Sequence, residues 1–140
     1  MDTNKFTLEY FNNFGKGTLP DLLGIEITAV TEGELTGELQ IKPHHLAPNG
    51  FLHAGTVVTL ADTVSGYACF SHLPDGANNF TTIELKSNHL GTAREGAITA
   101  TAKLVHAGRT TQVWDATVAN KATGKTIALF RCTQMLLYPK

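Results

Sequence analysis

The segment NGFLHAGTVVTLAD, residues 49–62, is the most informative part of this 140-residue chain. Small residues and His53 come directly before a mostly apolar stretch, and that stretch carries one carboxylate, Asp62. A charge within an apolar helix is costly unless it has a use. The first N–H groups of a helix have no partner within it, so they are open to a ligand. The segment therefore predicts a site that polarises a carbonyl group and attacks it.

Residues 53–70 are predicted to form one long central helix. They contain no Lys, Arg or Glu, so little of this helix is expected to face solvent. We therefore expect it to be buried on most sides, with other elements wrapped around it. Its apolar positions recur at helical spacing: Val57, Leu60, Ala61, Val64 and Ala68.

The rest of the chain reads as a short helix and six strands in a single domain, residues 1–140. Residues 4–14 predict the helix, with Thr3 or Asn4 as its cap. A helix, two strands, a long helix and four strands in that order predict an α+β fold, with one antiparallel sheet wrapped around the central helix. A second copy of the chain is expected to cover the sheet edges. The predicted strands are residues 25–30, 35–41, 80–89, 97–106, 111–119 and 126–137.

Composition excludes several classes of function. The net charge is −1 and no basic stripe is present, which argues against a nucleic-acid partner. No apolar run could span a bilayer and no signal-peptide pattern is visible, so we expect a cytoplasmic protein without a membrane partner. Cys69 and Cys132 lie in apolar stretches and are expected to be buried, reduced thiols. The spacing of His44, His45, His53 and Asp62 fits no standard pattern of metal ligands, so no metal is expected.

The central motif resembles that of the hotdog-fold acyl-CoA thioesterases, most closely the phenylacetate-pathway (PaaI-like) branch. It consists of residues 50–55 followed by Leu60-Ala61-Asp62-Thr63, and the strand order extends the resemblance over residues 20–137. The resemblance implies a hotdog fold, a small-molecule acyl-CoA substrate and no cofactor, since coenzyme A belongs to the substrate. It also implies a homodimer at least and a homotetramer as the full assembly. Two positions depart from the family: Ala54 replaces a Gly, and Ala47 replaces a frequent Asn.

The residue types suggest how such a site would work. Asp62 is the expected nucleophile or general base, and both roles remain open. The N–H of Ala54, with Gly55 behind it, is the expected donor to the oxyanion. The resemblance implies that His53 orients either the acyl carbonyl or the loop before the helix, and that Thr82 contacts the thioester or the attacking water. It further implies that His53 and Ala54 come from one subunit and Asp62 and Thr82 from the other.

Further residues are assigned to substrate binding. These are Asn49, the nearest Asn to the family position, Gly55 and Arg109. Basic residues near the site would contact the phosphates of coenzyme A, and Arg94, Arg109 and Lys125 are the candidates. Candidates for the acyl pocket are Tyr67, Phe51 and Leu52.

Two alternatives compete with a thioesterase. A hotdog dehydratase or hydratase would pair a His with a carboxylate in a different arrangement, which the sequence does not contain. A non-catalytic protein that binds acyl-CoA or another small ligand would need the same pocket, and Ala54 in place of Gly leaves that alternative open.

Overall fold

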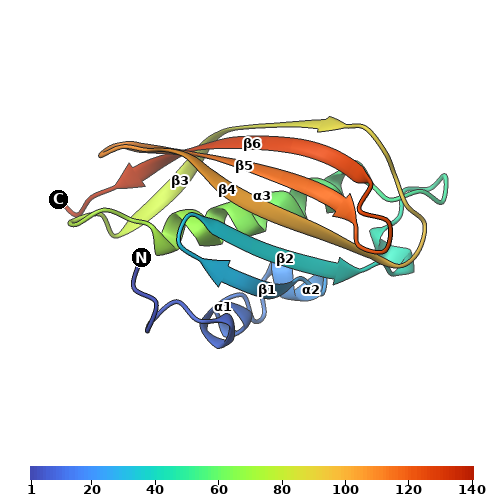
Figure 1. Ribbon diagram of the computed structural model, residues 1–140, viewed down its shortest axis with the longest axis horizontal. Helices are drawn as coiled ribbons and strands as arrows, with labels where there is room; N and C mark the ends of the chain where they lie inside the picture. The colour runs from blue at the N-terminus through green and yellow to red at the C-terminus, as the bar shows by residue number, and fades with distance from the viewer.

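The computed structural model describes all 140 residues as one sheet wrapped around one long helix (Figure 1). This confirms the predicted α+β architecture with an antiparallel sheet around a central helix. The elements are α1 (Leu8–Phe14), α2 (Leu19–Leu22), β1 (Glu26–Thr31), β2 (Glu34–Gln40), the short 3-10 helix η1 (Pro43–His45), α3 (Ala54–Ser71), β3 (Asn79–His89), β4 (Ala97–Ala107), β5 (Thr111–Asn120) and β6 (Thr126–Leu137).

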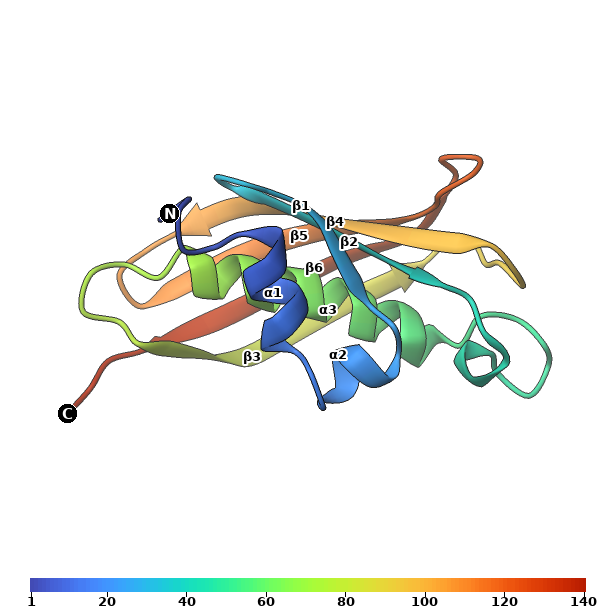
Figure 2. The ribbon, with the colours of Figure 1, turned by 90° about the horizontal axis from the view of Figure 1, so that it is seen from below.

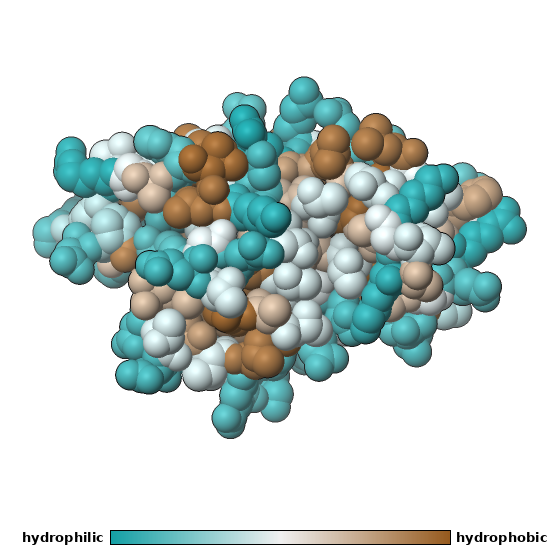
Figure 3. Space-filling view, in the orientation of Figure 1, coloured by the Kyte–Doolittle hydropathy of each residue, from teal (hydrophilic) through white to brown (hydrophobic).

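The six strands are all antiparallel and lie in the order β1-β2-β4-β5-β6-β3. The two edges of the sheet are therefore β1 and β3. Figure 2 shows the sheet curling around α3, with β1 and β2 on one side of the helix and β3 on the other. The outer surface seen in Figure 3 is mainly polar or neutral, with hydrophobic residues in small separate patches.

Helix α3 packs so closely against the sheet that one strand needs a glycine. A Cβ atom at Gly37 of β2 would lie 2.8 Å from Cγ1 of Val64 and 3.1 Å from Cδ1 of Ile27. Small side chains on the inner face of the sheet continue this close approach. The helix residues buried as a result are Thr56, Val57, Leu60, Ala61, Thr63, Val64, Ser65, Gly66, Ala68, Cys69 and Ser71.

Helix α1 begins later than the sequence suggests, and the predicted cap was wrong. Its N-cap is Thr7, whose side chain accepts a hydrogen bond from the N–H of Tyr10 at 3.1 Å. The residues before it form a separate turn, because the side chain of Asp2 accepts from the N–H groups of Asn4 and Lys5. A polar side chain at either earlier position therefore has no helix start to cap.

The loop in front of α3 is held by His45, which is buried. Its Nδ1 accepts from the N–H of Lys42 at 2.9 Å and its Nε2 donates to the carbonyl of Leu23 at 2.8 Å. Its own carbonyl accepts from the N–H of His53 at 3.0 Å and from Oγ1 of Thr56 at 2.9 Å. Burial lowers the pKa of His45, which favours the neutral ring that these bonds require. This residue thus fixes where the first turn of α3 begins.

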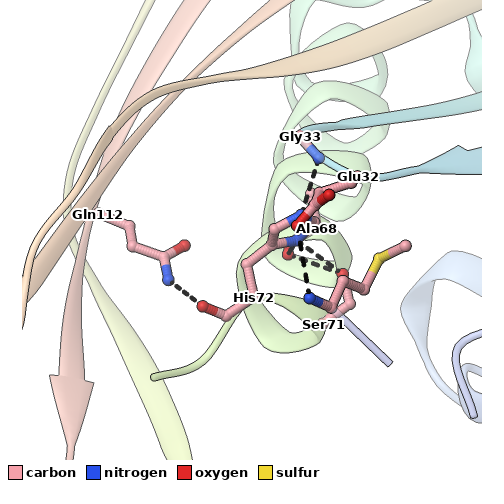
Figure 4. Close-up of polar contacts among 7 residues, drawn as sticks. Glu32, Gly33, Ala68, Ser71, His72 and Gln112 are labelled. Atoms are coloured by element: carbon pink, nitrogen blue, oxygen red, sulfur yellow. Dashed lines mark hydrogen bonds and ion pairs between the residues drawn. The ribbon is translucent and has the colours of Figure 1, made fainter. Parts of the chain in front are cut away.

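The other end of α3 is held by a second histidine, His72 (Figure 4). Its Nδ1 donates to the carbonyl of Ala68 at 2.7 Å, and its Nε2 accepts from the N–H of Gly33 at 2.8 Å in the β1–β2 turn. The carbonyl of His72 accepts from the buried side chain of Gln112 at 2.8 Å. Burial lowers the pKa of this ring as well. Neutral histidines therefore tie both ends of α3 to the surrounding elements.

We predict that His45→Gln lowers the free energy of unfolding by about 1–3 kcal/mol at pH 7.5, because buried backbone groups lose well-placed partners. The unfolded histidine binds a proton with its ordinary pKa of 6.5, whereas the folded pKa is lower. The stabilisation is therefore complete above pH 6.5 and is lost as the pH falls below it. Urea titrations at pH 7.5 and 5.5 should show a larger loss at the higher pH.

The neighbouring His44 supplies the matched control, since its side chain is exposed. His44→Gln should change the unfolding free energy by less than about 0.5 kcal/mol at either pH. Equal losses in the two variants would contradict the structural role assigned to His45.

Candidate active site

A groove of about 550 Å³ lies between α3 and β3 and contains the central carboxylate. Asp62 and Thr82, which are predicted to act together, both line it. The strand bulges directly after Thr82, where the pairing with β6 shifts by one residue. The other lining residues are Phe14, Thr63, Gly66, Tyr67, Phe70, Asn78, Asn79 and Phe80.

The carboxylate of Asp62 has no partner of its own. Its Oδ1 is buried without a hydrogen bond, and the residue takes part in none of the ion pairs of the chain. Burial raises the pKa of this carboxyl group. Negative charge on Asp62, after burial itself, also helps to raise the pKa of the nearby Cys132 thiol to about 11. A buried carboxylate left unsatisfied destabilises the fold, and such groups are concentrated at functional sites.

The N-terminus of α3 presents the predicted carbonyl-binding groups. His53 is the N-cap residue, and its Nδ1 accepts from the N–H of Gly55 at 2.7 Å. In the neutral ring the proton must then lie on Nε2, which is left as a free donor. The N–H of Ala54 makes no hydrogen bond and stands at the positive end of the helix. The N-terminus of α3 thus has two donors without a partner, the Ala54 N–H and the His53 Nε2–H.

Alanine in place of the family glycine fits the backbone here. No residue other than glycine has a positive φ in this chain, so Ala54 is not strained. The conformational need for glycine at this position is therefore absent, and the N–H that matters is still present.

The two halves of the site do not meet within one chain. Eight residues separate Ala54 from Asp62, which corresponds to about 12 Å along the axis of α3. Neither His53 nor Ala54 lines the groove beside the carboxylate. A carbonyl oxygen held by the Ala54 N–H at about 3 Å therefore lies out of reach of Asp62 in the same chain.

The residues assigned to substrate binding lie at separate places. Asn49 is exposed, and its side chain accepts from the N–H of Phe51 at 3.1 Å within the loop before α3. The N–H of Gly55 donates to Nδ1 of His53. Arg109 is exposed in the β4–β5 turn, at the opposite end of the molecule from the start of α3 (Figure 1), and its carbonyl accepts from the hydroxyl of Tyr138. One chain does not bring these three residues together.

Of the candidates for the acyl pocket, only Tyr67 lines the groove. Phe51 lies beneath the guanidinium of Arg94, 4.1 Å from ring centre to Cζ, and Leu52 is buried in the core. Phe14, Phe70 and Phe80 also line the groove, and the sequence did not predict them as pocket residues. No local pattern marks them, because they come from three elements that meet only in the folded chain.

No helix combines the length and apolar character needed to cross a membrane. No three His, Cys, Asp or Glu side chains converge as metal ligands would. The reactive groups that the structure shows are the carboxylate and the Thr82 hydroxyl in the groove and the N–H donors at the start of α3.

The chain is similar in sequence and in structure to several known proteins. Two relatives named 1,4-dihydroxy-2-naphthoyl-CoA hydrolase are each 32% identical to this chain. The match to the protein from Listeria monocytogenes covers 82% of this chain and 92% of the relative. The match to the protein from Escherichia coli covers 79% of this chain and 80% of the relative. A variant of the thioesterase PA1618 from Pseudomonas aeruginosa has a similar structure, with a TM-score of 0.90, 32% identity and 96% of both chains covered. The thioesterase HI1161 from Haemophilus influenzae has a TM-score of 0.89 at 30% identity, over 95% of this chain and 92% of its own.

The family model described as "Thioesterase superfamily" matches residues 49–127. That range includes the N-terminus of α3, the whole of the helix and Thr82 on β3. Both halves of the site therefore fall within the family match, and the chain belongs to the thioesterase superfamily as a thioester hydrolase.

Proposed function

We propose that this chain hydrolyses acyl-CoA thioesters, with Asp62 driving the attack on the carbonyl carbon. The observation that carries the proposal is the buried, unpartnered Oδ1 of Asp62 facing no cation in a groove large enough for an acyl group. The relatives named for hydrolysis of a naphthoyl-CoA support coenzyme A as the carrier. Thr82, on the opposite wall, is proposed to contact the thioester or the attacking water.

The chemistry needs one oxygen stabilised and one bond broken. The N–H of Ala54 and the Nε2–H of His53 would bind the carbonyl oxygen as it gains negative charge. As a general base, Asp62 would take a proton from water while the water oxygen bonds to the carbonyl carbon. The C–S bond then breaks, and the thiolate takes up the proton to give the free acid and coenzyme A. As a nucleophile, the Asp62 carboxylate would instead attack the carbonyl carbon, and the C–S bond would break to release the thiolate and leave an anhydride. Water would then hydrolyse the anhydride, which gives the free acid, restores the Asp62 carboxylate and supplies the proton that the thiolate takes up.

A second copy of the chain would complete the site. Strand β3 pairs only with β6, so its other edge carries unpaired backbone groups along its length. Ile83 and Leu85 on this strand are 53% and 43% exposed. A partner joined along β3 would lie beside the groove and could bring its own α3 N-terminus to Asp62. We therefore propose a homodimer at least, and the resemblance to hotdog thioesterases extends this to a homotetramer.

Substrate phosphates would be bound by exposed cations near the site. Arg109 remains our candidate from the β4–β5 turn, and Arg94 is a candidate beside the start of α3. The N–H of Leu52 donates to the carbonyl of Ala93 at 3.0 Å, which places the Arg94 loop against the loop before α3. Asn49 would act through the shape of the loop before α3, and Gly55 through its hydrogen bond to His53 in the first turn of the helix.

We predict that Asp62→Asn lowers kcat by about 10²–10⁴-fold, because the attacking group loses its negative charge. Release of coenzyme A from a panel of acyl-CoA thioesters, followed with a thiol-reactive dye, measures this effect. Asp75→Asn, at an exposed carboxylate outside the groove, is the control and should retain wild-type activity. Unchanged activity of Asp62→Asn would contradict the assigned role. Wild-type protein that binds acyl-CoA without releasing coenzyme A would instead indicate a binding protein.

The Ala54 N–H can be removed almost alone, by Ala54→Pro. Proline is favoured at the first position of a helix, and His53 already has the extended conformation (φ −68°, ψ 134°) that a following proline requires. We predict that kcat falls about 10²–10³-fold while the melting temperature changes little. Ala54→Ser, which keeps the N–H, should retain most of the activity. A fully active Ala54→Pro enzyme would exclude this N–H as the oxyanion donor.

The ionised side chain of Asp62 should also lower the free energy of unfolding at neutral pH. Its folded pKa is raised above the ordinary value of 3.8, so ionisation opposes folding above the raised pKa, and this cost disappears as the pH falls to 3.8. Asp62→Asn should therefore unfold at higher urea concentration than wild type at pH 7.5, with a smaller difference at pH 4. An equal difference at both pH values would show that the charge is not its source.

A further inference from the structure

The groove beside Asp62 has an aromatic wall that includes a residue outside the family match. Phe14 of α1 precedes residues 49–127, whereas Tyr67 and Phe70 of α3 and Phe80 of β3 lie within that range. The aromatic rings therefore come from three elements. Helix α1 contributes to the groove a side chain that the matched family core does not supply.

The ring of Phe14 is oriented by its neighbours and yet uncovered. It stacks on Phe70 with ring centres 5.4 Å apart and planes at 24°, and it meets Tyr67 edge-on at 5.5 Å and 79°. Despite these contacts, 49% of Phe14 remains exposed. Tyr10 also stacks on this ring, with ring centres 5.7 Å apart and planes at 18°. Three aromatic neighbours thus orient the ring of Phe14, and the residue still lines the groove.

Helix α1 is anchored firmly enough to serve as a rigid wall. The side chain of Asn12 donates to the carbonyl of Ile27 at 3.0 Å and accepts from its N–H at 2.8 Å, so it pairs with the edge of β1 as a neighbouring strand would. Tyr67 also stacks on Phe11, with ring centres 5.4 Å apart and planes at 13°. The hydroxyl of Tyr67 lies where a Cβ atom at Gly15 would be, so a side chain there would push the helix away. These contacts hold Phe14 in place before any ligand arrives.

The chemistry of the groove suits the acyl part of the substrate. Asp62 is the one charged residue that lines it, so the groove has no cation to bind the phosphates of coenzyme A. Aromatic faces and edges are attracted to a flat ring beyond what the buried area alone contributes. A flexible alkyl chain would gain the buried area without that additional attraction.

We infer that Phe14 is a specificity-determining residue and that the preferred acyl group carries an aromatic ring, which packs against Phe14, Phe70 and Phe80. This inference rests on the proposed hydrolysis of acyl-CoA. The ring occupies the groove with its carbonyl directed toward Asp62, and α1 favours aromatic over aliphatic acyl groups.

The test compares benzoyl-CoA with hexanoyl-CoA as substrates for the full chain. The wild type should have the higher kcat/KM with benzoyl-CoA. Phe14→Ala should lower kcat/KM for benzoyl-CoA about three- to ten-fold more than for hexanoyl-CoA, because both acyl groups lose buried area and only the aromatic one also loses the attraction between rings. Phe14→Leu keeps apolar bulk against Tyr67 and Phe70, and it should show the same selective loss without unfolding α1. Leu8→Ala is the matched control, because Leu8 is 43% exposed on the same helix but does not line the groove.

Each outcome separates the inference from the proposed function. Hydrolysis of both thioesters without a preference for the ring, or equal losses for both in Phe14→Ala and Phe14→Leu, would overturn the inference and leave the proposed function standing. No hydrolysis of either thioester by the wild type would overturn both.

Discussion

The packing of α3 against the inner face of the sheet buries most of that helix and leaves open the two parts of it that carry the proposed chemistry. One is its N-terminus, where the loop held by His45 ends and the N–H of Ala54 has no partner. The other is the side beside β3, where Asp62 lines the groove. Because a helix rises about 1.5 Å per residue, these two parts are about 12 Å apart in any one chain. The fold thus supplies a donor and an attacking group and keeps them separate.

The placement of Asp62 shows how the fold supports a reactive group at a cost. Burial without a hydrogen bond or a cation raises the pKa of the carboxyl group, which makes the carboxylate more basic and less favourable for folding. Stabilising contacts elsewhere offset this cost: α3 packs closely against Gly37, and the buried His45 and the half-buried His72 hold its two ends. Stability is concentrated around the helix, and the unsatisfied charge is confined to the position that the proposed reaction uses.

The sequence predicts the long helix well, because its apolar residues repeat at helical spacing and no long charged side chain interrupts them. It also predicts that Asp62 and Thr82 belong together, and both line one groove. The cap of α1 was not predicted, since Asp2 takes the N–H groups that an earlier cap would need. Phe14 was missed for a more general reason: its role depends on contacts between α1 and α3, more than fifty residues apart. Periodicity describes one element at a time and carries no information on which elements meet.

The central claim is that one active site is shared between two chains, and mixing two inactive variants tests it most directly. Ala54→Pro removes the donor and Asp62→Asn removes the attacking group, so each homodimer should be inactive. When both are co-expressed, about half of the random pairings are heterodimers, and each heterodimer has one intact site, in which Ala54 of one chain meets Asp62 of the other, so about one quarter of all sites should be intact. The account predicts recovery of roughly one quarter of the wild-type activity. If the mixture is no more active than the two variants alone, donor and carboxylate act within a single chain and the shared site is contradicted.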